Sequence, residues 1–337
     1  MRTRTALRRL GFATALSLSV WAVAIGGEPS GGAGRGPNQA QTAGGTTGGD
    51  ARATGGTRAG AARAANALPW PEPDAKAVEK LKAELRAELP PETFQVLQIG
   101  PWIVATDMDK LTAPRYTEYT IARYAADIQR QLFMKHPRSQ PLKVMLFRDK
   151  TSYETWNEKL FGEKPTTPYG YFSRARTAMV MNIGTGGGTL LHEMVHAMAE
   201  EDYPDIPAWL NEGLGSLFEA SDRSRTTGKV IGFTNWRLTG LQEDLKKGTA
   251  TRITDVLDMS DSKFYGARSG ANYATARYLM QYLQEQGKVE AFYTGIRDKK
   301  YASGAEALRA MFDNKKTLDQ IEEAWLVWVK ALQLDQR

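Results

Sequence analysis

The chain has 337 residues, of which 42% are hydrophobic, so it is long enough for one large domain or two small ones. Its formal charge of +6 belongs to residues 1–69, which hold eight arginines, no lysine and two acids, whereas the remainder has equal numbers of basic and acidic side chains. This distribution implies no nucleic-acid-binding face, and the absence of cysteine excludes disulfides, thiolate catalysis and cysteine metal ligands.

The first 69 residues have the pattern of an export leader followed by a linker. Four arginines, at positions 2, 4, 8 and 9, precede an apolar run over 10–25, and Ala22-Val23-Ala24 fits a small-x-small cleavage site. We expect a signal peptide over 1–25, or an uncleaved anchor, and a disordered Gly/Ala/Thr-rich linker over 26–69. The protein is therefore expected to be periplasmic, secreted or anchored at the cell surface.

Ordered structure is expected from Trp70 onward. Asp74 is placed to cap a helix over 75–89, within an N-terminal helical segment over 70–93. Strands over 94–99 and 102–106 flank a Gly-Pro turn, and a long helix is predicted over 114–135. A strand over 142–147, a helix capped by Asp149 and two strands over 169–173 and 178–183 follow, and the rest is mainly helical. This order predicts an α+β fold with a small mixed sheet and a helical C-terminal lobe.

The strongest chemical signal is His192-Glu193-Met194-Val195-His196. On a helix, the four-residue spacing puts both imidazoles on one face, where they can share one tetrahedral zinc ion. Glu193 lies beside them and can reach a water molecule at the metal, as a general base must. The alternative is an ordinary helix with two surface histidines.

A catalytic zinc site needs a third protein ligand, and the next predicted helix supplies Glu212. Sixteen positions separate it from His196, which leaves room for a turn and an antiparallel return. Gly213 and Gly215 are poor helix formers, so their presence beside an acid indicates a close helix–helix approach. Glu219, two turns further on, is a candidate hydrogen-bond acceptor for a zinc-bound imidazole. The alternative for both acids is a solvated helix surface.

The two motifs resemble those of the gluzincin metallopeptidases, the group that includes thermolysin and the aminopeptidase N family. Trp209-Leu210-Asn211-Glu212-Gly213 is similar to the second zinc motif of that family, and the resemblance implies that Glu212 is the third zinc ligand. It also implies a zincin-like domain over 94–337 and an oxyanion-stabilising tyrosine at Tyr273, although Ala276 stands where the family has glycine. Tyr265 and Tyr278 are rivals for that role.

These expectations combine into a zinc-dependent peptidase that acts on protein or peptide substrates. Zinc held by His192, His196 and Glu212 would activate water, with Glu193 as general base and Tyr273 as oxyanion donor. The segment 178–182 has no acid to hold a free substrate amine, which favours an endopeptidase. The alternatives are a non-catalytic cell-surface binding module on the same fold and a zinc hydrolase of a non-peptide amide or ester.

Overall fold

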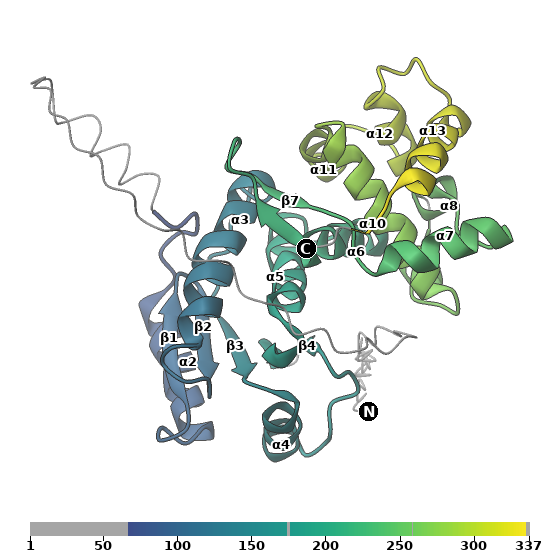
Figure 1. The fold of residues 1–337 in the computed structure, drawn as a ribbon. Coiled ribbons are helices and arrows are strands. Elements are labelled where there is room, and N and C mark those ends of the chain that lie inside the picture. The colour runs from purple at the N-terminus through teal and green to yellow at the C-terminus, as the bar shows by residue number, and fades with distance from the viewer. Residues whose placement is uncertain (1–66, 174–175, 258, 335–337) are drawn as a thin grey trace, which may run out of the picture.

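A computed structural model describes residues 67–173, 176–257 and 259–334 (Figure 1). The predicted signal peptide over 1–25 lies outside these residues, as does the predicted linker over 26–69 apart from its last three positions. Both therefore stay predictions. Along the described parts of the chain, no helix is long and apolar enough to cross a membrane.

A five-stranded mixed sheet forms the N-terminal half of the fold, in the order β1-β2-β3-β5-β4. The central pairs β2/β3 and β3/β5 are parallel, whereas the outer pairs β1/β2 and β4/β5 are antiparallel. The strands are β1 (Gln95–Ile99), β2 (Trp102–Thr106), β3 (Leu142–Phe147), β4 (Gly170–Ser173) and β5 (Ala178–Asn182). All five predicted strands are confirmed, and the two over 169–173 and 178–183 pair as a hairpin.

Helices cover both faces of this sheet, so the central strands are apolar on both sides. Side chains alternate along β2: Trp102 and Val104 join the core shared with the C-terminal helices, and Ile103 and Ala105 join a smaller core. The smaller core is closed by α2 (Ala75–Glu88) and α4 (Lys150–Phe161), whose N-caps Asp74 and Asp149 accept backbone hydrogen bonds as predicted. Helix α2 thus packs on the sheet face opposite the His192 helix.

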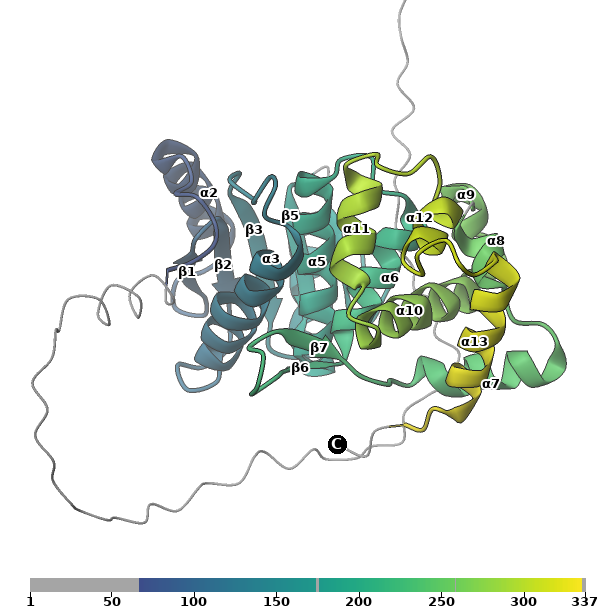
Figure 2. The same ribbon diagram turned by 90° about the horizontal axis from the view of Figure 1, so that it is seen from above.

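The His192 helix, α5 (Gly187–Asp202), lies between the sheet and the helical half of the molecule (Figure 2). It packs against α6 (Ala208–Glu219), which in turn packs against α10 (Ser269–Glu285). The remaining helices of this half are α7 (Arg237–Lys247), α8 (Ile253–Leu257), α9 (Asp261–Phe264), α11 (Val289–Arg297), α12 (Gly304–Ala310) and α13 (Leu318–Ala331). The fold is α+β, with a small mixed sheet and many helices, as predicted.

The structure departs from the predicted elements in two places. The helix expected over 114–135 is a π-helix over Arg115–Ala125 that continues as α3 (Ala126–Leu132). At its start the Thr117 hydroxyl donates to the carbonyl of Ala113, two residues before the helix begins, and hydrophobic spacing cannot reveal such a bond. The second departure is a short hairpin after α6, β6 (Ser221–Arg223) and β7 (Val230–Gly232), inside a region predicted as helical.

Candidate metal centre

Helix α5 presents His192 and His196 on one face, as their four-residue spacing requires. The helix is buried along most of its length, and both imidazoles are nearly inaccessible to solvent. Their rings lie edge to face, with centroids 4.6 Å apart and planes at 90°. This arrangement directs both Nε2 atoms toward the neighbouring helix α6.

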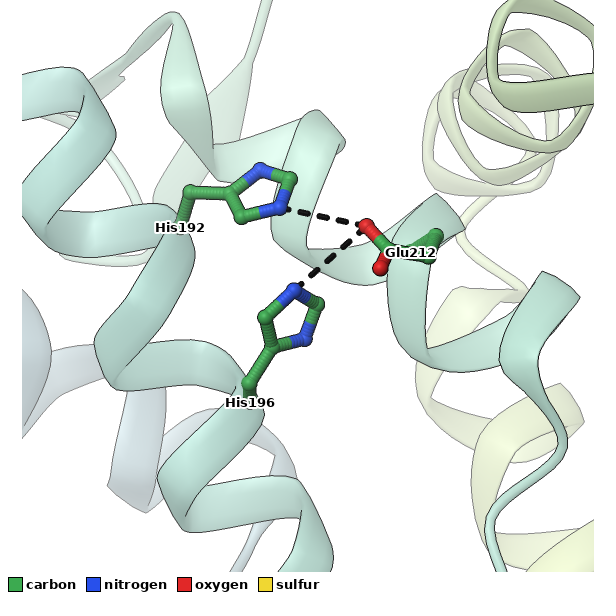
Figure 3. A group of neighbouring side chains, drawn as sticks. All are labelled: His192, His196 and Glu212. Carbon is green, nitrogen blue, oxygen red and sulfur yellow. Dashed lines mark hydrogen bonds and ion pairs between the residues drawn. The ribbon is translucent and has the colours of Figure 1, made fainter. Parts of the chain in front are cut away.

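Helix α6 places Glu212 opposite the two imidazoles, and its side chain is only 1% exposed. One carboxylate oxygen, Oε2, lies 3.2 Å from His192 Nε2 and 3.4 Å from His196 Nε2 (Figure 3). The three candidate ligand atoms lie within 4.8 Å of one another. The structure therefore brings together the three residues that the sequence predicted as ligands, and this buried group could hold a metal ion.

The two separations between histidine nitrogen and carboxylate oxygen fit one small tetrahedral ion. With metal–ligand bonds of about 2.0–2.1 Å, neighbouring ligand atoms of a tetrahedral zinc site lie about 3.3 Å apart. The two Nε2–Oε2 distances of 3.2 and 3.4 Å match this edge length. Two imidazole nitrogens and one carboxylate oxygen are also the donor types that zinc takes, whereas calcium and magnesium prefer all-oxygen sites.

Two glycines of α6 make this close approach sterically possible, as the sequence indicated. A Cβ atom at Gly215 would lie 3.0 Å from His196 Cε1 and 3.2 Å from His192 Nε2, which is too tight without a shift of the rings. A Cβ atom at Gly213 would lie 3.0 Å from Met280 Cγ, on α10. The missing side chain of Gly215 therefore leaves room for the imidazoles on one side of α6, and that of Gly213 leaves room for α10 on the other.

Neighbouring polar groups fix the orientation of two of the three candidate ligands. His196 Nδ1 lies 2.9 Å from Asn211 Oδ1; because this oxygen can only accept, Nδ1 donates to it, and Nε2 is the nitrogen that faces the metal position. The Tyr265 hydroxyl donates to Glu212 Oε1 at 3.1 Å. His192 Nδ1 is buried and has no hydrogen-bond partner among the described residues. Neither Asn211 nor this contact of Tyr265 was predicted, although Asn211 stands directly before Glu212 in an apolar helix.

Glu212 and His196 shift each other's pKa in opposite directions. Burial alone would raise the pKa of Glu212, but His196 and His192 outweigh it and hold that pKa well below its usual range. Burial would lower the pKa of His196, but Glu212 more than offsets this and raises it to about 9. Without a metal, protonated His196 and the Glu212 carboxylate therefore form an ion pair, with Nε2 and Oε2 3.4 Å apart.

Glu193 follows His192 on α5 and lies beside the same group. Burial raises the pKa of its carboxyl group, although the two histidines act in the opposite direction. Its side chain keeps some solvent exposure, and no other described side chain donates a hydrogen bond to it. A carboxylate with an elevated pKa and no competing donor is suited to accept and return a proton.

The three tyrosines considered for the oxyanion role lie in different surroundings. Tyr273, on α10, is nearly buried, and burial, Glu212 and Glu193 all raise the pKa of its hydroxyl. Tyr265 precedes α10 and contacts Glu212 directly. The Tyr278 hydroxyl instead donates to the Asn235 backbone carbonyl, so its polar atom is used within the fold.

The expected hydrogen bond from a ligand imidazole to Glu219 is wrong. Glu219 Oε2 instead pairs with Arg237 Nη1 and lies 3.5 Å from Asn235 Nδ2. Arg237 follows Glu219 by eighteen positions and lies beyond the β6–β7 hairpin, which the sequence did not predict. A buried arginine is the stronger partner for this carboxylate, since both groups of the ion pair are charged, whereas a neutral imidazole carries no charge of its own.

Comparison with known proteins adds a match to one family model. The model is described as a protein of unknown function (DUF1570) and matches residues 188–301. The matched segment runs from the first turn of α5 past the end of α11, so it contains the three candidate ligands, Glu193 and both Tyr265 and Tyr273. No curated protein matches the chain.

Proposed function

We propose that this protein is a zinc-dependent peptidase with a gluzincin-like catalytic centre that hydrolyses internal peptide bonds. The observation that carries the proposal is the convergence of His192, His196 and Glu212 on one point, with Glu193 on the same helix. A histidine–histidine–glutamate set leaves the fourth position of a tetrahedral ion open, as catalytic zinc requires. The resemblance to the gluzincin motifs supports the same conclusion.

The candidate ligands fit zinc, and the chemistry follows from their arrangement. A bound zinc ion would supply Lewis acidity, which polarises the substrate carbonyl and makes a water molecule easier to deprotonate. Glu193 takes the proton of the attacking water and returns it to the leaving amine. Its raised pKa suits both steps, because a group that titrates closer to neutrality can accept and donate in turn.

The proposal assigns the oxyanion donor to Tyr273. Burial and two nearby carboxylates, Glu212 and Glu193, keep its hydroxyl protonated, so it can only donate toward a developing negative charge. Because Glu212 and Glu193 both raise the pKa of Tyr273, its phenol is expected to lie between the third ligand and the general base.

The sheet offers a place for an extended substrate. Strand β4 is the edge strand next to α5, and its outer side has no strand partner in the described sheet. A peptide could add to this edge by backbone hydrogen bonds, which read the main chain rather than a terminus. Together with the absence of an acid from 178–182, this supports internal cleavage. The basic and apolar N-terminal sequence supports action outside the cytoplasm.

The test is cleavage of a broad peptide library by the zinc-loaded protein and by Glu193→Gln. The variant should keep its zinc and lose activity by about 10²–10⁴-fold, the usual contribution of a positioned base. Glu243→Gln, an exposed acid on α7, is the matched control and should cleave like the wild type. Zinc bound without any cleavage would instead favour the binding module, and full activity of Glu193→Gln would refute the mechanism.

A further inference from the structure

The two carboxylate oxygens of Glu212 have different partners: one faces the two histidines and the other accepts from a tyrosine hydroxyl. Its Oε2 atom faces the two Nε2 atoms of the histidines, at 3.2 and 3.4 Å. Its Oε1 atom accepts a hydrogen bond from the Tyr265 hydroxyl at 3.1 Å. Because the two oxygens have separate partners, the plane of the carboxylate is fixed and one oxygen alone is directed toward the metal position.

Tyr265 is itself anchored to the helix that carries Glu212. It directly follows the short helix α9, and its backbone N–H donates to the Asp261 carbonyl at 3.0 Å. The Asp261 carboxylate accepts the Ala208 N–H, in the first turn of α6, at 2.9 Å. The preceding Phe264 is fully buried, and its carbonyl accepts from the Asn272 amide at 2.9 Å. The phenol therefore reaches Glu212 from a support tied to both α6 and α10.

We propose that Tyr265 is a positioning residue that makes Glu212 a one-oxygen ligand of the metal. This inference rests on the proposed zinc centre and adds a role that the ligand set does not contain. By occupying Oε1, the phenol keeps that oxygen from turning toward the metal, and it satisfies a buried acceptor that would otherwise be costly to leave unpaired. A single-oxygen contact leaves room at the metal for the substrate carbonyl.

Tyr265 and Tyr273 then have separate tasks. Their rings are neighbours, with centroids 6.3 Å apart. After burial, Glu212 acts most strongly on both phenols, and Glu193 acts in addition on Tyr273. Tyr265 makes the 3.1 Å hydrogen bond that fixes Glu212 Oε1, whereas Tyr273 lies between the third ligand and the general base. We therefore expect Tyr265→Phe to change zinc binding and Tyr273→Phe to change turnover.

The experiment compares Tyr265→Phe with Tyr273→Phe in the full chain. Zinc affinity is measured by competition with a chromophoric chelator, and the visible spectrum of the cobalt-substituted protein reports the coordination number. Tyr265→Phe should bind zinc about 10–100-fold more weakly, the usual effect of removing a partner of a metal ligand. Its cobalt bands should weaken, because a carboxylate free to bind through both oxygens raises the coordination number. Tyr273→Phe should keep the wild-type affinity and spectrum and lose turnover.

Urea unfolding of the metal-free variants separates this role from a structural one. Tyr265→Phe leaves a buried acceptor unpaired, so it should unfold at a lower urea concentration than the wild type but still cooperatively, and its zinc affinity and cobalt spectrum then report on folded protein. Wild-type zinc affinity and spectrum in Tyr265→Phe would overturn the inference, as would equal losses of affinity in both variants. If the wild-type protein binds no zinc, the proposed function fails, and the inference fails with it. If the wild type binds zinc and Tyr265→Phe is unchanged, only the inference fails.

Discussion

Gly215 is the residue on which the metal centre makes the strictest steric demand. A methyl group there would lie 3.0 Å from His196 Cε1 and 3.2 Å from His192 Nε2, so both rings would have to move by a few tenths of an ångström. Alanine is also the better helix former, by about 1 kcal/mol. The two effects act on different properties of the protein, metal binding and helix stability.

We predict that Gly215→Ala lowers zinc affinity by at least about tenfold without lowering the unfolding free energy of the metal-free protein. Gly240→Ala is the matched control, because Gly240 lies in α7 and no atom would come within 4 Å of its added Cβ. It should raise stability and leave zinc affinity unchanged. Chelator competition and urea unfolding measure the two quantities, and unchanged affinity in Gly215→Ala would contradict the geometry.

If His196 is a metal ligand, its titration makes metal binding depend on pH. In the metal-free protein its pKa is raised to about 9, so at pH 7 the ring carries a proton that a metal at Nε2 must displace. Zinc affinity should therefore rise by about tenfold per pH unit between pH 7 and 9 and level off above this range. Calorimetry in buffers of different ionisation enthalpy should detect the released proton. A flat affinity from pH 7 to 9 would contradict the ion pair with Glu212.

The two histidines could be predicted from sequence because helical spacing alone sets their relative position, and Glu212 could be predicted from a second motif on the next helix. His192, Glu193 and His196 occupy one turn, and Glu212 stands in a second motif on the next helix. The partners of these residues could not be predicted in the same way. The predicted partner of Glu219 was wrong because its actual partner, Arg237, lies beyond an unpredicted hairpin. The contact between Tyr265 and Glu212 could not be predicted because 53 positions separate them in the sequence.

At the scale of elements, the contact between α9 and the start of α6 supports the site. The Asp261 carboxylate accepts the Ala208 N–H, one of the first-turn donors that a helix leaves without an internal partner. Pro207, at the N-cap, makes no side-chain hydrogen bond to this turn. Asp261 therefore serves as the cap of α6 from outside and sets the position of Tyr265.

We predict that Asp261→Ala lowers the unfolding free energy by about 1 kcal/mol, as the loss of a helix cap does, and also weakens zinc binding. Asp149→Ala removes the ordinary cap of α4, whose carboxylate accepts the Ser152 N–H at 2.8 Å, and should cost a similar amount of stability. Its zinc affinity should be that of the wild type. Equal zinc affinities in the two variants would show that α9 does not support the centre.

Helices and strands could be predicted from the sequence where the hydrophobic periodicity was strong, and the prediction failed where this periodicity was weak. The strands of the sheet and the caps Asp74 and Asp149 have local signals, namely apolar runs and side chains that bond the first helical turn. The hairpin of β6 and β7 has three residues in each strand, too few for a recognisable alternation. Its position depends on contacts with distant helices, such as the bond from the Gln284 amide to the Gly232 carbonyl.

For the whole molecule, the metal position lies at the junction of two central helices. Helix α5 packs on the sheet and α6 packs on α10, so an ion between them would tie the two halves together. Ligand binding to the folded state alone raises stability, by about 4 kcal/mol when free ligand exceeds its dissociation constant a thousandfold. We predict that a chelator lowers the Tm of the zinc-loaded wild type. His192→Ala should show no such shift, and an identical shift in both would place the bound metal elsewhere.

The central claim is that His192, His196 and Glu212 hold one zinc ion. The most direct measurement is the zinc content of the purified protein by inductively coupled plasma mass spectrometry, after zinc loading and removal of free metal. We predict about one zinc ion per wild-type chain and nearly none in His192→Ala or in Glu212→Ala. Zinc-free wild-type protein, or variants that keep the wild-type zinc content, would contradict it.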